Sequence, residues 1–444
     1  VAWLDRVPEW AVLQARLERA VDAVPLFRTR PLAPPARLST PRWTLDPDFD
    51  LSWHLRRQRA GEPADASAVL ELAHKAATTA FDSAHPLWEF TLVDGLDGGR
   101  GALVMKLHHA LTDGVGGMQL ALLLFDRSEE ASLLPAEVGG MGFDEPPAFP
   151  TGSADGRGEL AEAALSHDLR VVADVARRGG AGLGPAVVRA ARHPMTSTVG
   201  ALETLASTWR FVAPVRATMS PLMTRRGLGR RLGMLRVGLA DLRAAGAAVD
   251  GTVNDAFVAA VTGGLRRYHE RHGAAVDELR ITLPISTRRP GDPVAGDRLT
   301  LARFPVPVGV ADPAERIRAT GARCRVACAE RAIPYSNTIA GALNLLPSSI
   351  VGGMLKCVDF LASDVPGFPF PVYLAGARLR GYYAFGPTIG AALNATLLSY
   401  DGTCYVGVTV DTDAVDDPDA LFDCLRQGFD EVLSVADRRG AEVA

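Results

Sequence analysis

Hydrophobic residues recur at helical spacing in the first part of the chain, where apolar positions fall on one face of each segment. A proline-rich stretch at 31–41 ends the first of these segments. The helices that the pattern predicts are 9–24, 65–80, 115–126, 159–190 and 196–213.

Strict alternation of apolar and polar residues predicts a β-hairpin between the second and third of these helices. One strand covers 87–93, the glycine-rich segment 95–101 makes the turn, and the second strand returns as 102–109. The hairpin leads directly into the predicted helix at 115–126.

The last part of the chain mixes both patterns. Thr252 and Asp255 are spaced as a capping box at the start of a strong helix. Asp401-Gly402 favours a tight turn between two strands, and Pro418 begins a closing helix. The strands that the pattern predicts are 278–286, 300–310, 371–385, 391–400 and 403–411.

Interleaved strands and helices place the chain in the α/β class, with two halves of related architecture. The predicted division is an N-terminal half at 1–126, a linker and bridging helices at 127–215, and a C-terminal half at 216–444. The linker assignment depends on 127–158, which is rich in proline, glycine and acidic residues.

Composition narrows the function. The 444 residues are 48% hydrophobic and 22% charged, which is typical of a globular protein. A net charge of −4 gives no bias toward polyanions, so we expect no nucleic-acid partner. The five cysteines contain no C-x-x-C pair, and no signal peptide or apolar run of about 18 residues is visible. We therefore expect a cytoplasmic protein.

One segment carries most of the chemical information: His108-His109 followed by Asp113-Gly114 at the end of the predicted hairpin. Strand alternation predicts that the two histidines point to opposite faces and do not bind one metal. Imidazole has an unperturbed pKa near 6.5, so it can take a proton from a hydroxyl as the oxygen attacks a thioester. The alternative is an ordinary strand end with two hydrogen-bonded histidines and an Asp-Gly turn.

His108–Gly114 resembles the His-His-x-x-x-Asp-Gly signature of the superfamily that includes chloramphenicol acetyltransferase and condensation domains. Further segments make the whole chain resemble the bacterial wax ester synthase/diacylglycerol acyltransferase family. Those segments are Pro86-Leu87-Trp88, Asn254-Asp255, Ser363–Gly367, Gly386-Pro387, Asn394 and Ser399-Tyr400. The resemblance implies two chloramphenicol acetyltransferase-like domains with mixed sheets and an active-site tunnel at their interface.

The resemblance implies direct transfer of a fatty acyl group from acyl-CoA to diacylglycerol or a long-chain alcohol, without a covalent intermediate. His109 would be the general base, while His108, Asp113 and Gly114 complete the catalytic segment, Asp113 through backbone or arginine contacts such as one to Arg288. Acyl-CoA is a substrate here and no cofactor is implied. No Gly-x-Ser-x-Gly nucleophile segment occurs, and the spacing of His269 and His272 predicts no metal site.

Substrate contacts are implied for Asn254, Asp255, Trp88 and Ser363, and each has a structural alternative. Trp88 suits a core position, Asn254-Asp255 suits a helix cap, and Ser363–Gly367 suits a turn before a strand. The Arg225–Arg236 cluster fits CoA phosphates or an anionic membrane surface, and equally a solvated helix end. The lipid substrates imply peripheral association with the membrane or with lipid droplets.

Some positions depart from the family pattern. Asp364 stands where the family usually has Asn, and Phe368 stands where it usually has Pro. Asp297 interrupts the usual Gly-Asn-Arg, and the usual first strand before the helix at 9–24 is not expected here. These departures bear on the preferred acceptor. Two rival functions are a condensation-type transferase that uses carrier-bound substrates and an inactive lipid-binding relative.

Overall fold

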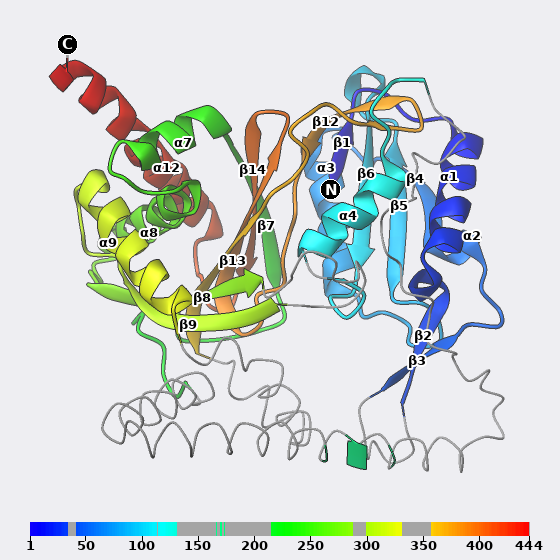
Figure 1. Cartoon of the computed structure of the whole chain (residues 1–444), viewed down its shortest axis with the longest axis horizontal. Coiled ribbons are helices and arrows are strands. Elements are labelled where there is room, and N and C mark those ends of the chain that lie inside the picture. The colour runs from blue at the N-terminus through cyan, green and yellow to red at the C-terminus, as the bar shows by residue number, and fades with distance from the viewer. Residues whose placement is uncertain are drawn as a thin grey trace, which may run out of the picture.

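Two mixed six-stranded sheets stand side by side in the computed structural model, each with its own helices (Figure 1). The structure describes residues 1–33, 41–112, 114–130, 166, 169–170, 173, 215–286, 299–330 and 357–443. The α/β class with mixed sheets is therefore confirmed. The predicted helices at 159–190 and 196–213, and most of the linker, lie outside the described residues.

The first sheet gathers strands from both ends of the chain. Its strands, in spatial order, are β11 (Tyr373–Leu374), β12 (Ala377–Tyr382), β1 (Ala2–Leu4), β6 (Gly101–Leu107), β5 (Trp88–Asp94) and β4 (Leu55–Arg59). The predicted hairpin is confirmed, since β5 and β6 pair antiparallel with Trp88 opposite Leu107. A separate two-stranded sheet joins β2 (Thr29–Leu32) to β3 (Arg42–Leu45).

Helices cover both faces of the first sheet. On one face, α1 (Trp10–Ala23) and α4 (Gly114–Leu124) share a core with Leu103 of β6. On the other face, α3 (Ala66–Thr78) packs through Val69 against Val104. The short helix α2 (Leu51–His54) precedes β4. All three longer helices confirm the sequence prediction, because each has an apolar face that needs a sheet to cover it.

The second sheet belongs wholly to the C-terminal half. Its strands, in spatial order, are β7 (Arg230–Gly238), β14 (Thr403–Asp411), β13 (Ala391–Tyr400), β10 (Val358–Val365), β8 (Glu278–Ser286) and β9 (Leu299–Pro307). Its helices are α7 (Leu239–Ala247), α8 (Val253–Arg271), α9 (Pro313–Cys328) and α12 (Pro418–Val443). Asp401 and Gly402 both have positive φ, which gives the primed turn that favours a two-residue hairpin.

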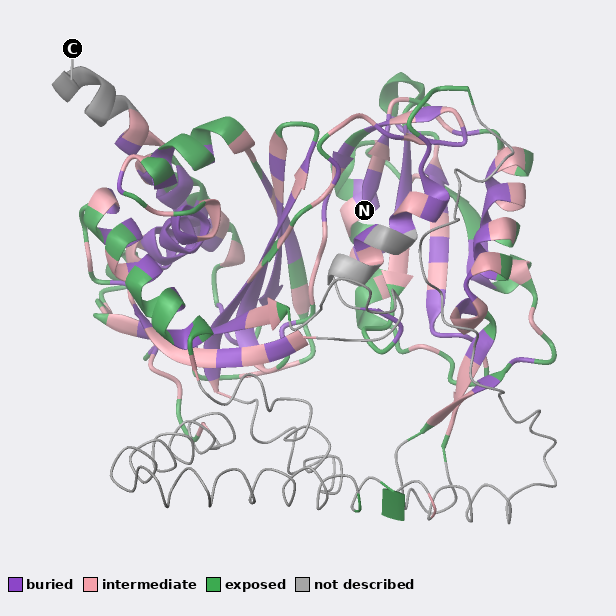
Figure 2. Ribbon diagram, viewed as in Figure 1, coloured by how far each residue is buried: buried purple, intermediate pink, exposed green. Residues whose placement is uncertain are grey.

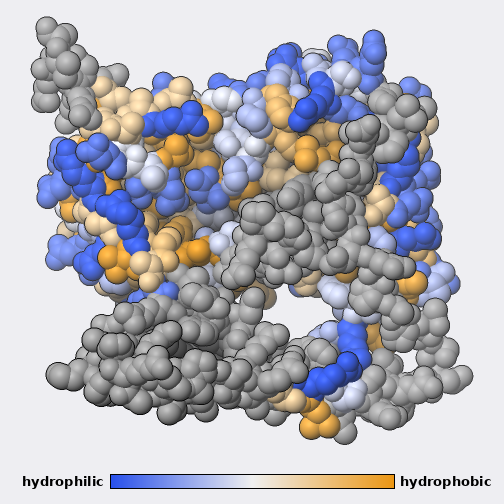
Figure 3. Space-filling model, in the orientation of Figure 1, coloured by the Kyte–Doolittle hydropathy of each residue, from blue (hydrophilic) through white to orange (hydrophobic). Residues whose placement is uncertain are grey.

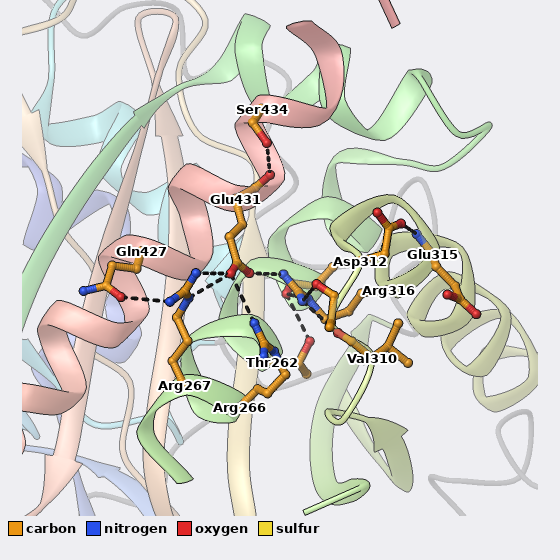
Figure 4. Close-up of polar contacts among 12 residues, drawn as sticks. Thr262, Arg266, Arg267, Val310, Asp312, Glu315, Arg316, Gln427, Glu431 and Ser434 are labelled. Atoms are coloured by element: carbon orange, nitrogen blue, oxygen red, sulfur yellow. Dashed lines mark hydrogen bonds and ion pairs between the residues drawn. The ribbon is translucent and has the colours of Figure 1, made fainter. Parts of the chain in front are cut away.

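A polar cluster joins three of these helices in the second half (Figure 4). The carboxylate of Glu431 on α12 accepts hydrogen bonds from Arg266 and Arg267 of α8 and from Arg316 of α9. The Arg316 side chain is fully buried, and its guanidinium also donates to the carbonyls of Ala259 and Val310. We call these four charged residues, Glu431, Arg266, Arg267 and Arg316, the Glu431 cluster.

The segment 373–382 belongs to the predicted C-terminal half, which begins at 216, yet it forms part of the first sheet. This part of the C-terminal half crosses into the first sheet, where β12 pairs with β1. The hydroxyl of Tyr400 holds the crossing, since it accepts from the amide of Val372 and donates to the carbonyl of Leu379.

The prediction of no strand before the first helix is wrong, because Ala2–Leu4 forms β1 between β12 and β6.

Burial follows this arrangement, with buried residues on the strands of both sheets and exposed residues on the outer turns of the helices (Figure 2). On the face seen in Figure 3, hydrophilic residues dominate the outer flanks of the two halves, and hydrophobic residues show between them. Among the described residues, no helix is long and apolar enough to cross a membrane.

Candidate active site

The two histidines of the signature lie on a turn, not on a strand. β6 ends at Leu107, and the amide of Leu111 donates to the carbonyl of His108 at 2.9 Å. Leu111 is fully buried and anchors the turn in the core, while His108 and His109 are exposed. The prediction that both histidines lie on the strand is therefore wrong, so strand alternation does not set the directions of their rings. We call His108–Thr112 the catalytic turn, after the role that the resemblance implies for it.

Backbone contacts fix where the catalytic turn begins. The amide of His108 donates to the carbonyl of Leu87 at 3.0 Å, at the edge of β5. On its other side, helix α4 begins at Gly114 and leads away from the turn. Asp113, between turn and helix, and Arg288, its suggested partner, lie outside the described residues.

The two imidazoles have different surroundings. Nδ1 of His108 accepts from the amide of Ala110 at 3.1 Å, and the His108 and Phe81 rings meet edge to face with their centroids 6.0 Å apart. Partial removal from water, followed by the neighbouring His109, lowers the pKa of His108. Among the described residues, the His109 side chain makes no hydrogen bond. Within the described part of the chain, no group therefore occupies either ring nitrogen of His109.

Trp88 occupies the core beneath the catalytic turn. Its side chain is fully buried, its indole Nε1 donates to the carbonyl of Phe27 at 2.9 Å, and its ring stacks on His54 at 4.5 Å. This placement favours the core role over the substrate contact that the resemblance implies. Trp88 is the first residue of strand β5. The residue before it, Leu87, accepts the hydrogen bond from His108 that anchors the catalytic turn.

Asn254 and Asp255 open helix α8 as the sequence predicts. The carboxylate of Asp255 accepts from the amide of Thr252, and the Thr252 hydroxyl accepts from the amide of Asp255, which confirms the capping box. Asp255 is buried and lies 3.9 Å from Arg325, whereas Asn254 is half-buried. Within the described chain the Asn254 amide makes no hydrogen bond, so a substrate contact stays a prediction for Asn254 and has less support for Asp255.

Ser363 is part of β10, not of a turn before a strand, and it stands opposite Thr396 of β13. Asp364 follows it near the end of the strand, where it keeps contact with solvent. The surrounding protein removes enough water to raise the pKa of Asp364 to about 6. The acidic residue that replaces the usual Asn is thus poorly accommodated as a carboxylate.

Asn394 fixes the passage from the first sheet to the second. It is buried on β13, its amide Nδ2 donates to the carbonyl of Pro387 at 2.8 Å, and its Oδ1 accepts from Thr396. A Cβ atom at Gly386 would lie 2.3 Å from the Asn394 amide nitrogen, so a larger residue there would push that side chain away from Pro387. These contacts fix the connection between β12 and β13.

The Arg225–Arg236 cluster does not form a helix end. Arg230–Gly238 is the edge strand β7, and several of the arginines have partners within the protein. Arg226 donates to the carbonyls of Gly390 and Val358, and Arg230 lies 3.3 Å from Asp411. These two side chains are committed to the fold, which favours a structural role over phosphate binding.

A cavity of about 370 Å³ opens where the chain after α4 meets the crossing segment. The described residues that line it are Arg127, Phe370, Pro371 and Tyr373, and the Arg127 guanidinium lies 4.4 Å above the Phe370 ring. None of the predicted site residues is among them. An active-site tunnel between the halves therefore stays a prediction.

Sequence reasoning overlooked Lys106, which lies two residues before His108. Its ammonium is 4.0 Å from the centre of the Phe81 ring and 3.5 Å from Glu89. The chain holds three lysines, at 75, 106 and 356, among 47 basic residues. A lysine retained beside the histidines in a chain that otherwise uses arginine is the signal that could have identified it.

Sequence comparison matches both halves of the chain to one family. The profile of the wax ester synthase/diacylglycerol acyltransferase catalytic domain matches residues 5–257, and that of the corresponding C-terminal domain matches 295–432. A putative diacylglycerol O-acyltransferase of Mycobacterium tuberculosis is 34% identical over 98% of this chain and 87% of its own length. A probable diacylglycerol O-acyltransferase of the same organism is 31% identical over 86% and 82%, respectively.

Solved structures show the same fold. The wax ester synthase/diacylglycerol acyltransferase of Marinobacter aquaeolei VT8 superposes with a TM-score of 0.62 at 21% identity, covering 98% of this chain and 93% of that one. The first condensation domain of the CDA synthetase gives a TM-score of 0.54 at 15% identity, covering 98% and 89%. The expected two-domain architecture is thereby confirmed.

Proposed function

Because the chain belongs to the wax ester synthase/diacylglycerol acyltransferase family, it is an acyltransferase, and we propose that it moves a fatty acyl group from acyl-CoA to diacylglycerol. A long-chain alcohol is the second acceptor. The observation that carries the proposal is the catalytic turn, which presents His109 to solvent with no hydrogen-bond partner among the described residues. The named relatives favour diacylglycerol.

The chemistry follows from the properties of an alcohol. A hydroxyl is almost wholly protonated at neutral pH, so His109 takes its proton as the oxygen attacks the thioester carbonyl. The new C–O ester bond forms, the C–S bond breaks, and the imidazolium returns the proton to the CoA thiolate. Such general-base assistance is worth about 10²–10⁴ in rate. No covalent acyl-enzyme is needed.

The surroundings of His108 support His109 as the base. Nδ1 of His108 accepts from the Ala110 amide, so the neutral ring carries its proton on Nε2. The lowered pKa of His108 keeps that ring uncharged near neutral pH. A neutral neighbour leaves His109 able to accept a proton, whereas a cationic neighbour would oppose it. His108 thus contributes as a neutral part of the turn.

The acceptor is a membrane lipid, so we infer that the enzyme works at the surface of a membrane or a lipid droplet. No described helix is long and apolar enough to cross a membrane, and binding at the surface requires none. Vesicles that carry diacylglycerol are therefore the appropriate form of the substrate for a test.

The test measures CoA-thiol release from palmitoyl-CoA with dipalmitoylglycerol vesicles and, separately, with hexadecanol. Variant H109Q is compared with H272Q, which changes an exposed histidine of the second half. We expect acceptor-dependent release from the wild type and from H272Q, and a loss of about 10²–10⁴-fold in H109Q. Release equal in H109Q and H272Q removes His109 from the mechanism. No release from folded wild type favours a carrier-dependent or inactive relative.

A further inference from the structure

Lys106 carries a charge in a poorly hydrated place beside the catalytic turn. Its side chain is 11% exposed, and within the described chain its ammonium makes no hydrogen bond. Burying an ammonium without hydrogen bonds costs free energy unless other charges or rings offset the loss of water. Two groups do so here: Glu89 at 3.5 Å and the face of the Phe81 ring at 4.0 Å.

The three side chains are set by the sheet. Glu89 of β5 stands directly opposite Lys106 of β6, so their side chains share one face of the hairpin. Phe81 comes from the chain between α3 and β5, and its ring contacts both Lys106 and His108. The Phe81 and His108 rings meet edge to face, with their centroids 6.0 Å apart. One aromatic ring therefore links the lysine to the first histidine of the catalytic turn.

We propose that Lys106 is a positioning residue, whose ammonium holds Phe81 against His108 and so fixes the catalytic turn. The inference rests on the proposed function for its effect on the reaction, although the contact itself does not depend on it. Removing the cation frees the Phe81 ring, and the His108 ring then loses the neighbour that keeps it partly out of water. His109, the next residue, shifts with it.

Lys106 also places a cation near His108, whose pKa is lowered by burial first and by the neighbouring His109 second. The two ring distances share the Phe81 centroid, so the ammonium lies within about 10 Å of the His108 ring, about one Debye length at 0.1 M salt. A cation at this range disfavours protonation of the histidine. The other titratable or charged groups on the elements around this face are Glu89 on β5, Arg56 on β4, His74 on α3, Asp82 and His85 before β5, and His109. Lys75 on α3 is instead exposed and paired with Glu71.

The first test measures the pKa of His108 in the absence of substrate. Histidine labelled with ¹³C at Cε1 gives one NMR titration curve per ring, and H108Q identifies the curve of His108. We expect the pKa of His108 to rise in K106M, which removes a cation, and to fall in E89Q, which leaves that cation uncompensated. K75M is the matched control, since Lys75 is an exposed lysine paired with Glu71. Opposite shifts distinguish electrostatic positioning from a general loosening of the fold.

The second test measures kcat and KM for the acyl transfer. We expect kcat to fall about 10-fold in K106M with the KM for palmitoyl-CoA unchanged, because small displacements of a catalytic group cost rate rather than binding. K106R keeps a cation over the ring and should restore most of kcat, while K75M should match the wild type. A His108 titration in K106M equal to that in K75M overturns the proposal. If the wild type transfers no acyl group, the proposed function fails, and the NMR result still decides the placement of Lys106.

Discussion

The Glu431 cluster and the catalytic turn are both polar, yet the fold treats them in opposite ways. In the cluster, one carboxylate receives three guanidinium groups, and Arg316 is fully buried with further bonds to backbone carbonyls (Figure 4). In the turn, and among the described residues, the His108 ring accepts one hydrogen bond, from the backbone amide of Ala110, and the His109 ring makes none. The cluster uses its polar groups to join helices, whereas the turn leaves an imidazole open to solvent.

The difference shows which of the two regions stabilises the fold and which is available for the reaction. Buried polar groups stabilise a fold only when nearly every donor and acceptor is satisfied, so a complete network indicates a structural role. A reacting side chain must instead keep its donor and acceptor positions available. On this basis, changes in the cluster should cost stability and changes in the turn should cost rate.

The largest expected effect on stability is that of R316M. Arg316 bonds to Glu431 and to the carbonyls of Ala259 and Val310, and methionine satisfies none of them. Breaking a buried ion pair by removing one partner typically costs about 3–5 kcal/mol. Urea unfolding should show a loss of this size in R316M. R325M, which changes a mostly exposed arginine of the same helix, should unfold within about 0.5 kcal/mol of the wild type. Equal losses in the two variants would break the comparison.

A comparison of His269 with His109 tests the same contrast within a single residue type. Its ring is fully buried, with Nε2 bonded to the Ser220 hydroxyl at 2.7 Å and Nδ1 bonded to the carbonyl of Leu265 at 2.8 Å. We expect H269Q to lose about 1–3 kcal/mol of stability, because buried polar partners are left unsatisfied. H109Q should keep the Tm of the wild type within a few degrees while losing activity. The reverse pattern would assign His109 to the fold.

The difference in stability between the wild type and H269Q should change with pH in one direction. Burial, the largest cause, lowers the pKa of His269, so the folded state resists protonation that the unfolded chain accepts near pH 6.5. Wild-type stability is unaffected by this group above pH 6.5 and falls as the pH drops below it. Since H269Q lacks this group, the stability difference between the two proteins should narrow from pH 7.5 to pH 5. A constant difference would show that His269 does not titrate in this way.

Local signals predicted the elements that local chemistry decides. The capping box of Thr252 and Asp255 and the turn at Asp401-Gly402 were predictable because neighbouring residues alone satisfy them. The crossing of 373–382 into the first sheet was not, since its partner strand β1 lies some 370 residues away in sequence. The catalytic turn was identified from its residue types, but its geometry was not, because a hydrogen bond from Leu111 ends the strand two residues before His109.

Asp364 stands between the two cases, since it is polar, reaches solvent and has an environment unsuited to its charge. Its pKa is raised to about 6 by loss of water, above the 3.8 of an unperturbed aspartate. Ionisation therefore costs the folded state stability as the pH rises from about 4 to 6, and the cost is complete above pH 6.

D364N restores the residue usual in the family and removes this cost. We expect its Tm to exceed that of the wild type by about one or two degrees at pH 8 and to match it at pH 4, with the energy kept below about 1 kcal/mol by solvent screening. S363A, a neighbouring change without charge, should show no such dependence on pH. A Tm gain in D364N that is equal at both pH values would mean that packing rather than charge distinguishes the two residues.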